Sequence, residues 1–339
     1  MNLIDVTQEL ATDEQCLAFL EKQRWPDGVV RCPTCGCDKI SRIGRKPGKV
    51  TRGKTEGEDR RNKRAQVYQC LEPTCKQQFS ATNGTIFHSS HLPLSKWFMA
   101  VALVMDAKKG ISAKQLQEHL GIGSYKTAWY MCHRIRKAMA VETSPFDQLR
   151  GIVEIDETYI GGKSKRRDGR ARNQKPRSEK FDMVLGMRER TRKDGKPGRV
   201  KLVHIPDGKK ETIREAVRKH VVPSPERLYT DSASVYPFAF DKELKKKHRS
   251  VNHSIQWIVP GTSIHTNTVE SAFSLLKRGL VGSFHRVSIK HLHRYLSEFE
   301  YRFNQRKAQD RFSMTVAAML KEIPMPYKQL VGEGNNDTK

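Results

Sequence analysis

The stretch GIVEIDETYIGG, residues 151–162, decides how the second half of this chain folds. Its run of Val, Ile, Thr and Tyr predicts a β-strand, and Asp156 lies within that strand. Two further acidic residues occupy other predicted elements: Asp231 ends the short run RLYTD, and Glu270 stands near the start of the helical stretch NTVESAFSLLKRGL. Because Mg²⁺ prefers oxygen ligands such as carboxylates, these three residues are candidate metal ligands.

The charge of the chain indicates the class of its partner. The 339 residues carry a formal net charge of +26, and the sequence pI is near 9.9. Such values are typical of nucleic-acid binders, so carboxylates that hold Mg²⁺ here indicate a metal-dependent enzyme acting on a polyanion. The longest apolar stretch, residues 98–105, is too short to span a bilayer, and the N-terminus lacks the features of a signal peptide. We expect a cytoplasmic, nucleoid-associated protein with no membrane partner.

The predicted elements change character along the chain. Residues 1–90 combine an amphipathic helix over 7–24 with a Cys-rich basic segment, and residues 91–145 show helical periodicity. Residues 146–325 contain strand-like runs and helices, and residues 326–339 form a tail. We therefore expect a multidomain α+β protein.

Within residues 146–325, four runs predict strands. They are expected at 151–160, 182–188, 199–205 and 227–231, with a helix at 211–221. Three strands, a helix and a further strand are typical of an α/β or α+β domain. Two basic stretches, 45–64 and 163–180, are expected to be loops, and the last residues, 333–339, to be disordered.

Four of the seven cysteines form two close pairs, the first in the turn CPTCG and the second with four residues between its members. The four are Cys32, Cys35, Cys70 and Cys75. Four thiolates make a closed site for one structural Zn²⁺, which would stabilise a segment too polar to build a core. Two alternatives stay open: Cys37 could replace Cys35, or the thiols could be free. Cys16 and Cys132 lie on predicted helices and are expected to pack there.

Residues 111–139 predict a helix-turn-helix, because two helical patterns flank a turn with glycines at 121 and 123. Ser124 can cap the second helix. That helix offers polar side chains for phosphate or base contact, namely Tyr125, Lys126, His133, Arg134, Arg136 and Lys137. Its packing stripe is Ala128, Met131, Ile135 and Met139. The alternative is an ordinary helical pair with a solvated basic face.

Two-metal phosphoryl transfer needs carboxylates that converge from separate elements, as the three acidic residues named above could. Each assignment has an alternative. Glu154 and Glu157 flank Asp156, and strand alternation puts Glu154 on the same face. Glu270 could instead belong to a capping box, since Asn267 stands three positions before it.

Lys277 follows Glu270 by seven residues, so two helical turns place both on one face. There it could hold a DNA phosphate near the metals, or it could be a surface lysine of an amphipathic helix. His265 and Asn267 either belong to the site or only shape the turn before the helix.

Motifs spread along the chain resemble those of the zinc-ribbon DDE transposases of bacterial insertion sequences, the ISXO-like group. They are RCPTCG at 31–36, FSATNGTIFHSSHLPLSKWF at 79–98, KKGISAKQL at 108–116, SYKTAWYMCHRIRKAM at 124–139, VEIDETYIGGK at 153–163, YTDSASVY at 229–236 and the stretch from HTNTVESAF to RFNQR at 265–306. The long basic loop and the widened second cysteine pair depart from the pattern of the ribbon.

The resemblance implies an RNase H-like catalytic fold with a DDE site at Asp156, Asp231 and Glu270, and Lys277 matches the lysine that follows the glutamate. Such a sheet would place Asp156 on its first strand and Asp231 at the end of an adjacent fourth strand.

A member of this group would bind the terminal inverted repeats of its element through the ribbon and the helix-turn-helix. It would use two Mg²⁺, or Mn²⁺, to nick double-stranded DNA at the element ends and to join the freed 3′ ends to target DNA. Holding two ends together implies a homodimer or a higher oligomer. Two alternatives stay open: a zinc-dependent DNA-binding regulator without catalysis, and an RNase H-like nuclease without strand transfer.

Overall fold

A computed structural model describes residues 1–43, 67–140, 147–161, 182–192 and 194–332. The predicted loops 45–64 and 163–180 and the predicted disorder of 333–339 all lie outside these described residues. No helix within the described ranges is long and apolar enough to cross a membrane.

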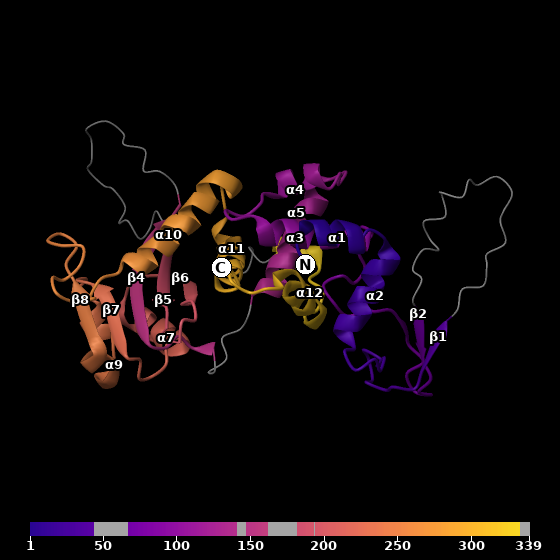
Figure 1. Ribbon diagram of the computed structural model, residues 1–339, viewed down its shortest axis with the longest axis horizontal. Coiled ribbons are helices and arrows are strands. Elements are labelled where there is room, and N and C mark those ends of the chain that lie inside the picture. Colours follow the sequence, from indigo (N-terminus) through magenta and orange to yellow (C-terminus); the bar gives the residue numbers. More distant parts are fainter. Residues whose placement is uncertain (44–66, 141–146, 162–181, 193, 333–339) are drawn as a thin grey trace. The chain divides into compact units, whose positions relative to one another are not determined.

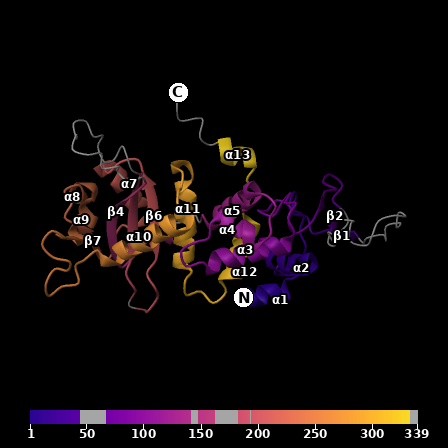
Figure 2. The same cartoon turned by 90° about the horizontal axis from the view of Figure 1, so that it is seen from above.

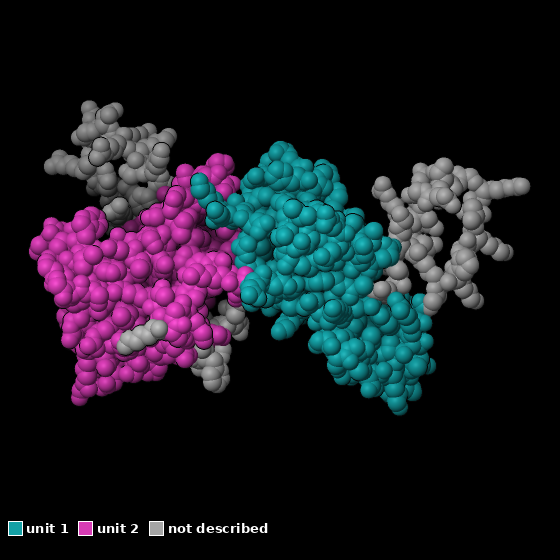
Figure 3. Space-filling model, viewed as in Figure 1, with its two compact units in different colours: residues 1–139, 309–339 teal, residues 140–308 magenta. Residues whose placement is uncertain are grey.

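The chain forms two compact units, drawn in different colours in Figure 3. Unit 1 comprises residues 1–139 and 309–339, and unit 2 comprises residues 140–308. The predicted regions 1–90 and 91–145 therefore lie almost entirely in one unit. The predicted boundary at 325 differs from the observed one, because α12 (Arg311–Lys321) packs against α2 (Asp13–Arg24), α3 (Leu94–Asp106) and α5 (Tyr125–Met139) of unit 1.

Two helices, α1 (Leu3–Glu9) and α2, replace the one helix that the pattern predicts over 7–24. The break comes at Thr12, which begins α2 with a capping box. Its hydroxyl accepts from the backbone N–H of Gln15 at 3.3 Å, and the Gln15 side chain accepts from the backbone N–H of Thr12 at 3.0 Å. This reciprocal cap stabilises a new helix start within a continuous apolar pattern.

The cysteine-rich region forms a small antiparallel sheet of β1 (Ile40–Ile43), β2 (Val67–Cys70) and β3 (Gln78–Phe79). Among its described residues, Tyr68 stacks on Phe79 with ring centroids 5.7 Å apart, and Trp25 meets Tyr68 edge-on at 5.9 Å. Strands of only two to four residues build a small core, so this segment depends on another source of stability.

The predicted pair of helices is present as α4 (Ala113–His119) and α5, joined by a turn over 120–124 (Figure 2). Ser112 caps α4 by accepting from Gln115, and the Ser124 carbonyl accepts from Ala128 at the start of α5. The helix α5 contacts α3, α4 and α12, so neighbours cover more than one of its faces. The short helix α13 (Tyr327–Gly332) completes the described part of unit 1 and buries Leu330.

Unit 2 is built on a five-stranded sheet whose strand order is β6-β5-β4-β7-β8 (Figure 1). The strands are β4 (Ile152–Ile160), β5 (Asp182–Glu189), β6 (Val200–Ile205), β7 (Arg227–Asp231) and β8 (His248–Val251). The first four agree with the predicted strands, and β4 is antiparallel to β5 but parallel to β7. The expected adjacency of the strands that carry Asp156 and Asp231 is therefore confirmed. The sequence HRSV of β8 has too few apolar residues to predict a strand.

Helices cover both faces of this sheet. One face packs against α7 (Lys210–His220), α8 (Tyr236–Ala239) and α9 (Lys242–Lys247), and the other against α10 (Asn267–Gly279) and α11 (Ile289–Asn304). A π-helical segment, η3 (Leu280–Phe284), follows α10 directly. In β4, Val153 and Ile155 belong to the first core, so alternation turns Glu154 and Asp156 toward the face of α10.

Gly186 of β5 lets α10 approach the sheet beside Asp156, its partner in the β4–β5 register. A Cβ atom at Gly186 would lie 2.4 Å from Cζ of Phe273 and 3.1 Å from a methyl group of Val269. Both residues are buried on α10. The absence of a side chain at this position therefore sets how close Glu270 comes to the strand.

Candidate functional site

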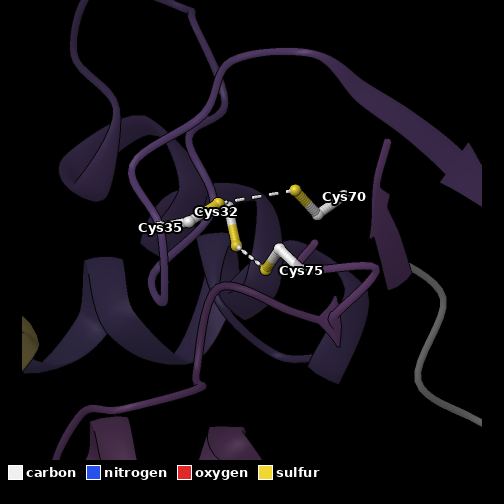
Figure 4. A group of neighbouring side chains, drawn as sticks. All are labelled: Cys32, Cys35, Cys70 and Cys75. Atoms are coloured by element: carbon white, nitrogen blue, oxygen red, sulfur yellow. Dashed lines mark hydrogen bonds between the residues drawn. The ribbon is translucent and has the colours of Figure 1, made fainter. Parts of the chain in front are cut away.

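Four sulfur atoms in unit 1 gather at the spacing of a metal site. The Sγ atoms of Cys32, Cys35, Cys70 and Cys75 all lie within 4.8 Å of one another and point toward a common centre (Figure 4). The Cys32–Cys75 and Cys35–Cys70 sulfur distances are 3.7 and 3.6 Å. Tetrahedral Zn²⁺ with bonds of about 2.3 Å requires sulfur atoms about 3.8 Å apart, so the donor set and its spacing fit zinc.

Backbone turns hold both cysteine pairs in place. The Cys32 carbonyl accepts from the N–H of Gly36, and the Cys32 N–H donates to Cys37 O, each at 2.9 Å. In the second pair, the Glu72 carbonyl accepts from the N–H groups of Cys75 and Lys76, and Lys76 adopts a left-handed φ of 45°. This turn accommodates the widened spacing of the second pair.

Cys37 lies outside the group of four sulfurs, whereas Cys35 belongs to it. The Cys37 sulfur instead accepts from the backbone N–H of Lys39 at 3.3 Å. Although burial opposes ionisation of Cys32, hydrogen bonds from the backbone of Cys35 and Thr34 lower the pKa of this thiol to about 7. The lowered pKa of Cys32 favours thiolate ligation at the first turn.

In unit 2, the strands β4 and β7 bring two of the predicted acidic residues together. Their parallel register pairs Val153 with Leu228 and Glu154 with Tyr229. Continuing that register by two residues brings Asp156 level with Asp231, on the same face of the sheet. Both side chains are partly exposed.

The charges of the acidic residues act on one another. Burial raises the pKa of Asp156 to about 7, and the carboxylates of Glu157, Asp231 and Glu270 add to this rise. A hydrogen bond of 2.8 Å from the N–H of Glu157 to Asp156 opposes it. Within the described residues, only the four cysteines bring three or more ligand atoms within 4.8 Å, so the acidic site is more open.

Glu270 is held by side chains that precede it. Its Oε1 atom accepts from the hydroxyl of Thr266 at 2.8 Å and lies 3.2 Å from Nε2 of His253. His253 also contacts the Thr266 hydroxyl at 2.6 Å. Asn267 is the first residue of α10 and not its cap, so the alternative in which Glu270 serves a capping box with Asn267 is wrong.

Glu154, the rival on the same strand face, caps α10 instead. This fully buried carboxylate accepts from the backbone N–H groups of Thr268 and Val269 at 2.9 and 3.0 Å. It also accepts from Nε of Arg190 at 2.6 Å. An anion at a helix N-terminus satisfies orphan N–H groups and favours the helix dipole. Glu154 therefore ties β4, two residues before Asp156, to the helix that carries Glu270.

Arg190 and His265 complete this connection, which we call the Glu154 clamp: Glu154, Arg190, His265 and the N–H groups of 268 and 269. Arg190 donates to the carbonyls of Ser263 and His265 at 2.7 and 3.0 Å. His265 lies 3.4 Å from Glu154, and burial together with Arg190 lowers the pKa of its imidazole. The sequence showed Glu154 and His265 as candidates, but the partner Arg190 carried no local signal.

Glu157 lies on the other face of β4. Its carboxylate accepts from the hydroxyl of Tyr236, which is fully buried. Burial raises the pKa of Glu157, and the Tyr236 hydrogen bond opposes that rise. Lys277 is exposed on α10, seven residues after Glu270. The structure thus separates Glu157 from the face of the acidic residues and leaves Lys277 exposed on the helix that carries Glu270.

Three of the six side chains predicted to contact DNA are buried in unit 1, which corrects that prediction for them. They are His133, Arg134 and Arg136. Arg134 donates to the carbonyls of Ile86 and His88 and stacks on Trp97, contacts that tie α5 to the preceding segment. The cause is the covering of α5 by three other helices.

The other three predicted contacts keep accessible surface. Tyr125 is 52% exposed, and Lys126 is exposed with its ammonium 4.2 Å from the ring centroid of Tyr327. Lys137 is half-buried and donates to the carbonyl of Ile323 at 2.9 Å. Accessible polar groups thus remain mainly at the N-terminal end of α5.

Comparison with known proteins adds two family matches. An ISXO2-like transposase domain covers residues 148–304, and a transposase zinc-ribbon domain covers residues 11–78. The first range contains all three acidic residues, and the second contains the four clustered cysteines.

This protein belongs to the zinc-ribbon transposases of insertion sequences. The chain is also similar to an uncharacterized protein in transposable element ISH50 of Halobacterium salinarum, with 28% identity over 311 residues. The aligned region covers 86% of this chain and 90% of the relative. The resemblance seen in the motifs is therefore confirmed at the level of the family.

Proposed function

We propose that this protein is a DNA transposase that binds the terminal inverted repeats of its insertion sequence, nicks the element ends and joins the freed 3′ ends to target DNA. Asp156, Asp231 and Glu270 are the catalytic residues and the ligands of two Mg²⁺ ions, for which Mn²⁺ can substitute. One Zn²⁺ at the clustered cysteines stabilises the ribbon.

The convergence of the three acidic residues carries this proposal. Asp156 and Asp231 come from adjacent parallel strands, and Glu270 comes from a helix clamped to the first of them. Like charges that raise the pKa of Asp156 are costly in a purely structural domain, and bound cations would offset that cost. The mixed sheet order and the two helical layers favour an RNase H-like fold for unit 2.

Bound at these carboxylates, Mg²⁺ would activate the attacking oxygen and stabilise the leaving oxygen. In the nicking step a water oxygen bonds to phosphorus and the bond to the 3′ oxygen breaks, which leaves a 3′-hydroxyl and a 5′-phosphate. In the joining step this 3′-hydroxyl attacks a target phosphodiester, whose own 3′ oxygen leaves. No covalent bond between protein and DNA is needed.

The residues of the chain position these groups. The Glu154 clamp fixes the start of α10 and hence the approach of Glu270 to the strands. Lys277, exposed two helical turns later, acts as a point charge for a DNA phosphate and cannot ligate a metal. Both Glu270 and Lys277 are therefore positioned by a helix and not by a loop.

Unit 1 supplies DNA binding in this proposal. Tyr125 and Lys126, exposed at the N-terminal end of α5, contact the element end, as the first residues of a recognition helix do. Because two element ends must be held together, the active form is a homodimer or a higher oligomer.

A cleavage assay with the full-length protein tests the proposal. The substrate is a duplex carrying the terminal inverted repeat that borders the coding sequence, incubated with Mg²⁺ and a plasmid target. We expect nicked products and strand-transfer products, both absent with Asp231→Asn, which should still bind the duplex. Binding without any cleavage by the unsubstituted protein would favour a regulator, and nicking without joining would favour a nuclease.

A further inference from the structure

An exposed apolar cluster lies in the segment between β8 and α10. Ile255, Trp257 and Ile258 are 77%, 67% and 45% exposed. The other three tryptophans of the chain, all among the described residues, are buried or half-buried. Three large apolar side chains are thus exposed within four consecutive residues of a strongly basic protein. A cluster of exposed apolar side chains is typical of a binding surface.

Hydrogen bonds within the segment give it a defined shape. Asn252 accepts through its carbonyl from the N–H groups of Ile255 and Gln256, each at 3.0 Å, and through its side chain from that of Ser254. Val259 donates to the carbonyl of Ile264 at 3.1 Å. The apolar side chains are thus presented on a folded turn, and their exposure does not come from a lack of local structure.

His253 connects this turn to the acidic site. The rings of Trp257 and His253 have centroids 5.5 Å apart, and Nε2 of His253 lies 3.2 Å from a carboxylate oxygen of Glu270. One imidazole therefore separates the exposed indole from the third acidic residue. Whatever occupies the acidic site comes within reach of Trp257.

We propose that this turn binds an unpaired nucleobase next to the scissile phosphate, with Trp257 stacking on the base and Ile255 and Ile258 wedging the duplex open. The inference rests on the proposed function, since it requires DNA at the acidic site. Aromatic faces stack on any base, and apolar side chains inserted at a base step unstack it. An opened end would let a strand enter a site made for a single phosphodiester.

A nucleobase fits this surface better than a second copy of the chain does. Three side chains cannot supply the roughly 800 Å² per partner that a stable protein interface buries. A base also needs one flat apolar partner beside a phosphate site, which is what an indole next to the acidic residues offers. The net charge of +26 favours a polyanionic partner as well.

Cleavage and fluorescence on one set of duplexes test the inference. The full-length protein receives terminal-repeat duplexes carrying 2-aminopurine beside the nick, either paired or opposite a mismatch. Trp257→Ala should cut the paired duplex roughly 10- to 100-fold more slowly. It should also lose the 2-aminopurine signal of the stacked base, whereas Trp257→Phe keeps most of both. The mismatch should partly rescue Trp257→Ala, because the unstacking cost has already been removed.

Phe238→Ala is the matched control, since Phe238 is 64% exposed but lies on α8, across the sheet from α10. It should behave like the unsubstituted protein. Equal cleavage and signal for Trp257→Ala would overturn this inference alone and leave the transposase proposal standing. A defect accompanied by loss of oligomers in sedimentation would also overturn it, in favour of a protein contact. No cleavage by the unsubstituted protein would overturn both proposals.

Discussion

The cysteine cluster of unit 1 and the acidic site of unit 2 are both candidate metal sites, but they are assembled in opposite ways. Two local turns bring the four sulfurs to within 4.8 Å of one another, close enough for all four to bind one Zn²⁺. The three carboxylates come from residues up to 114 positions apart in sequence and are held in place by contacts with other protein groups. Among the described residues, their oxygen atoms do not gather as closely as the four sulfur atoms do. A closed structural site is thus prepared by its turns, whereas an open site depends on the fold around it.

The largest effect is expected from breaking the closed site. Cys70→Ser should remove zinc and unfold the ribbon, because structural Zn²⁺ contributes on the order of 10 kcal/mol to the folding of small zinc domains. Metal analysis and thermal unfolding of the full chain measure this. Cys37→Ser is the control and should retain one zinc. Equal zinc content in the Cys70→Ser and Cys37→Ser variants would show that Cys70 is not a zinc ligand.

Changing the open site should abolish chemistry without loss of fold. Asp156→Asn should lower cleavage by roughly 1,000-fold or more. It should also make the metal-free protein more stable at neutral pH, because burial and neighbouring carboxylates raise the pKa of Asp156 to about 7. A catalytic loss joined to lower stability would indicate a structural aspartate.

The pH dependence of this effect has a definite sign. The folded state keeps the Asp156 proton up to about pH 7, whereas the unfolded chain releases it near pH 4. Stability of the metal-free protein therefore falls as pH rises between these values, and Asp156→Asn should flatten that part of the curve. Denaturant unfolding at pH 4.5 and pH 7.5 compares the two proteins.

A smaller effect is expected from the clamp that assembles the open site. Glu154→Gln removes the charge that faces Arg190 and the start of α10. This loss should lower the free energy of unfolding by about 3 kcal/mol. The rate of DNA cleavage should also fall at temperatures where the protein is folded, because Glu270 is no longer held in a fixed position relative to Asp156 and Asp231. Glu189→Gln is the matched control, because Glu189 is equally buried and pairs with Arg199 away from α10. Equal activity in the two variants would show that Glu154 only stabilises the fold.

The smallest effect concerns DNA binding by unit 1. Lys126→Gln should weaken binding and reduce the slope of log K against log salt by about one unit, as expected for one lost phosphate contact. Binding titrations at several salt concentrations give the slope. Lys137→Gln, whose ammonium donates to Ile323, should leave the slope unchanged. A change for Lys137 and none for Lys126 would reverse the face assigned to DNA.

Local signals predicted much of this structure. Strand-like apolar runs predicted β4, β5, β6 and β7, and the spacing of the two cysteine pairs predicted the metal group. The sequence carried no local signal for features that depend on contacts between residues far apart in the chain. The β8 strand depends on pairing with β7, and Arg134 is buried because α3, α4 and α12 surround α5. The role of Glu154 depends on a helix that begins 113 residues later in the chain.

The most direct measurement of the central claim is anomalous diffraction from Mn²⁺ in a crystal of the protein bound to its element end. We predict two manganese peaks about 4 Å apart that are bound by carboxylate oxygens of Asp156, Asp231 and Glu270. Glu270 must then exchange its contact with Thr266 for a metal bond. Peaks that leave Glu270 on Thr266 and His253, or no manganese between the two aspartates, would contradict the account.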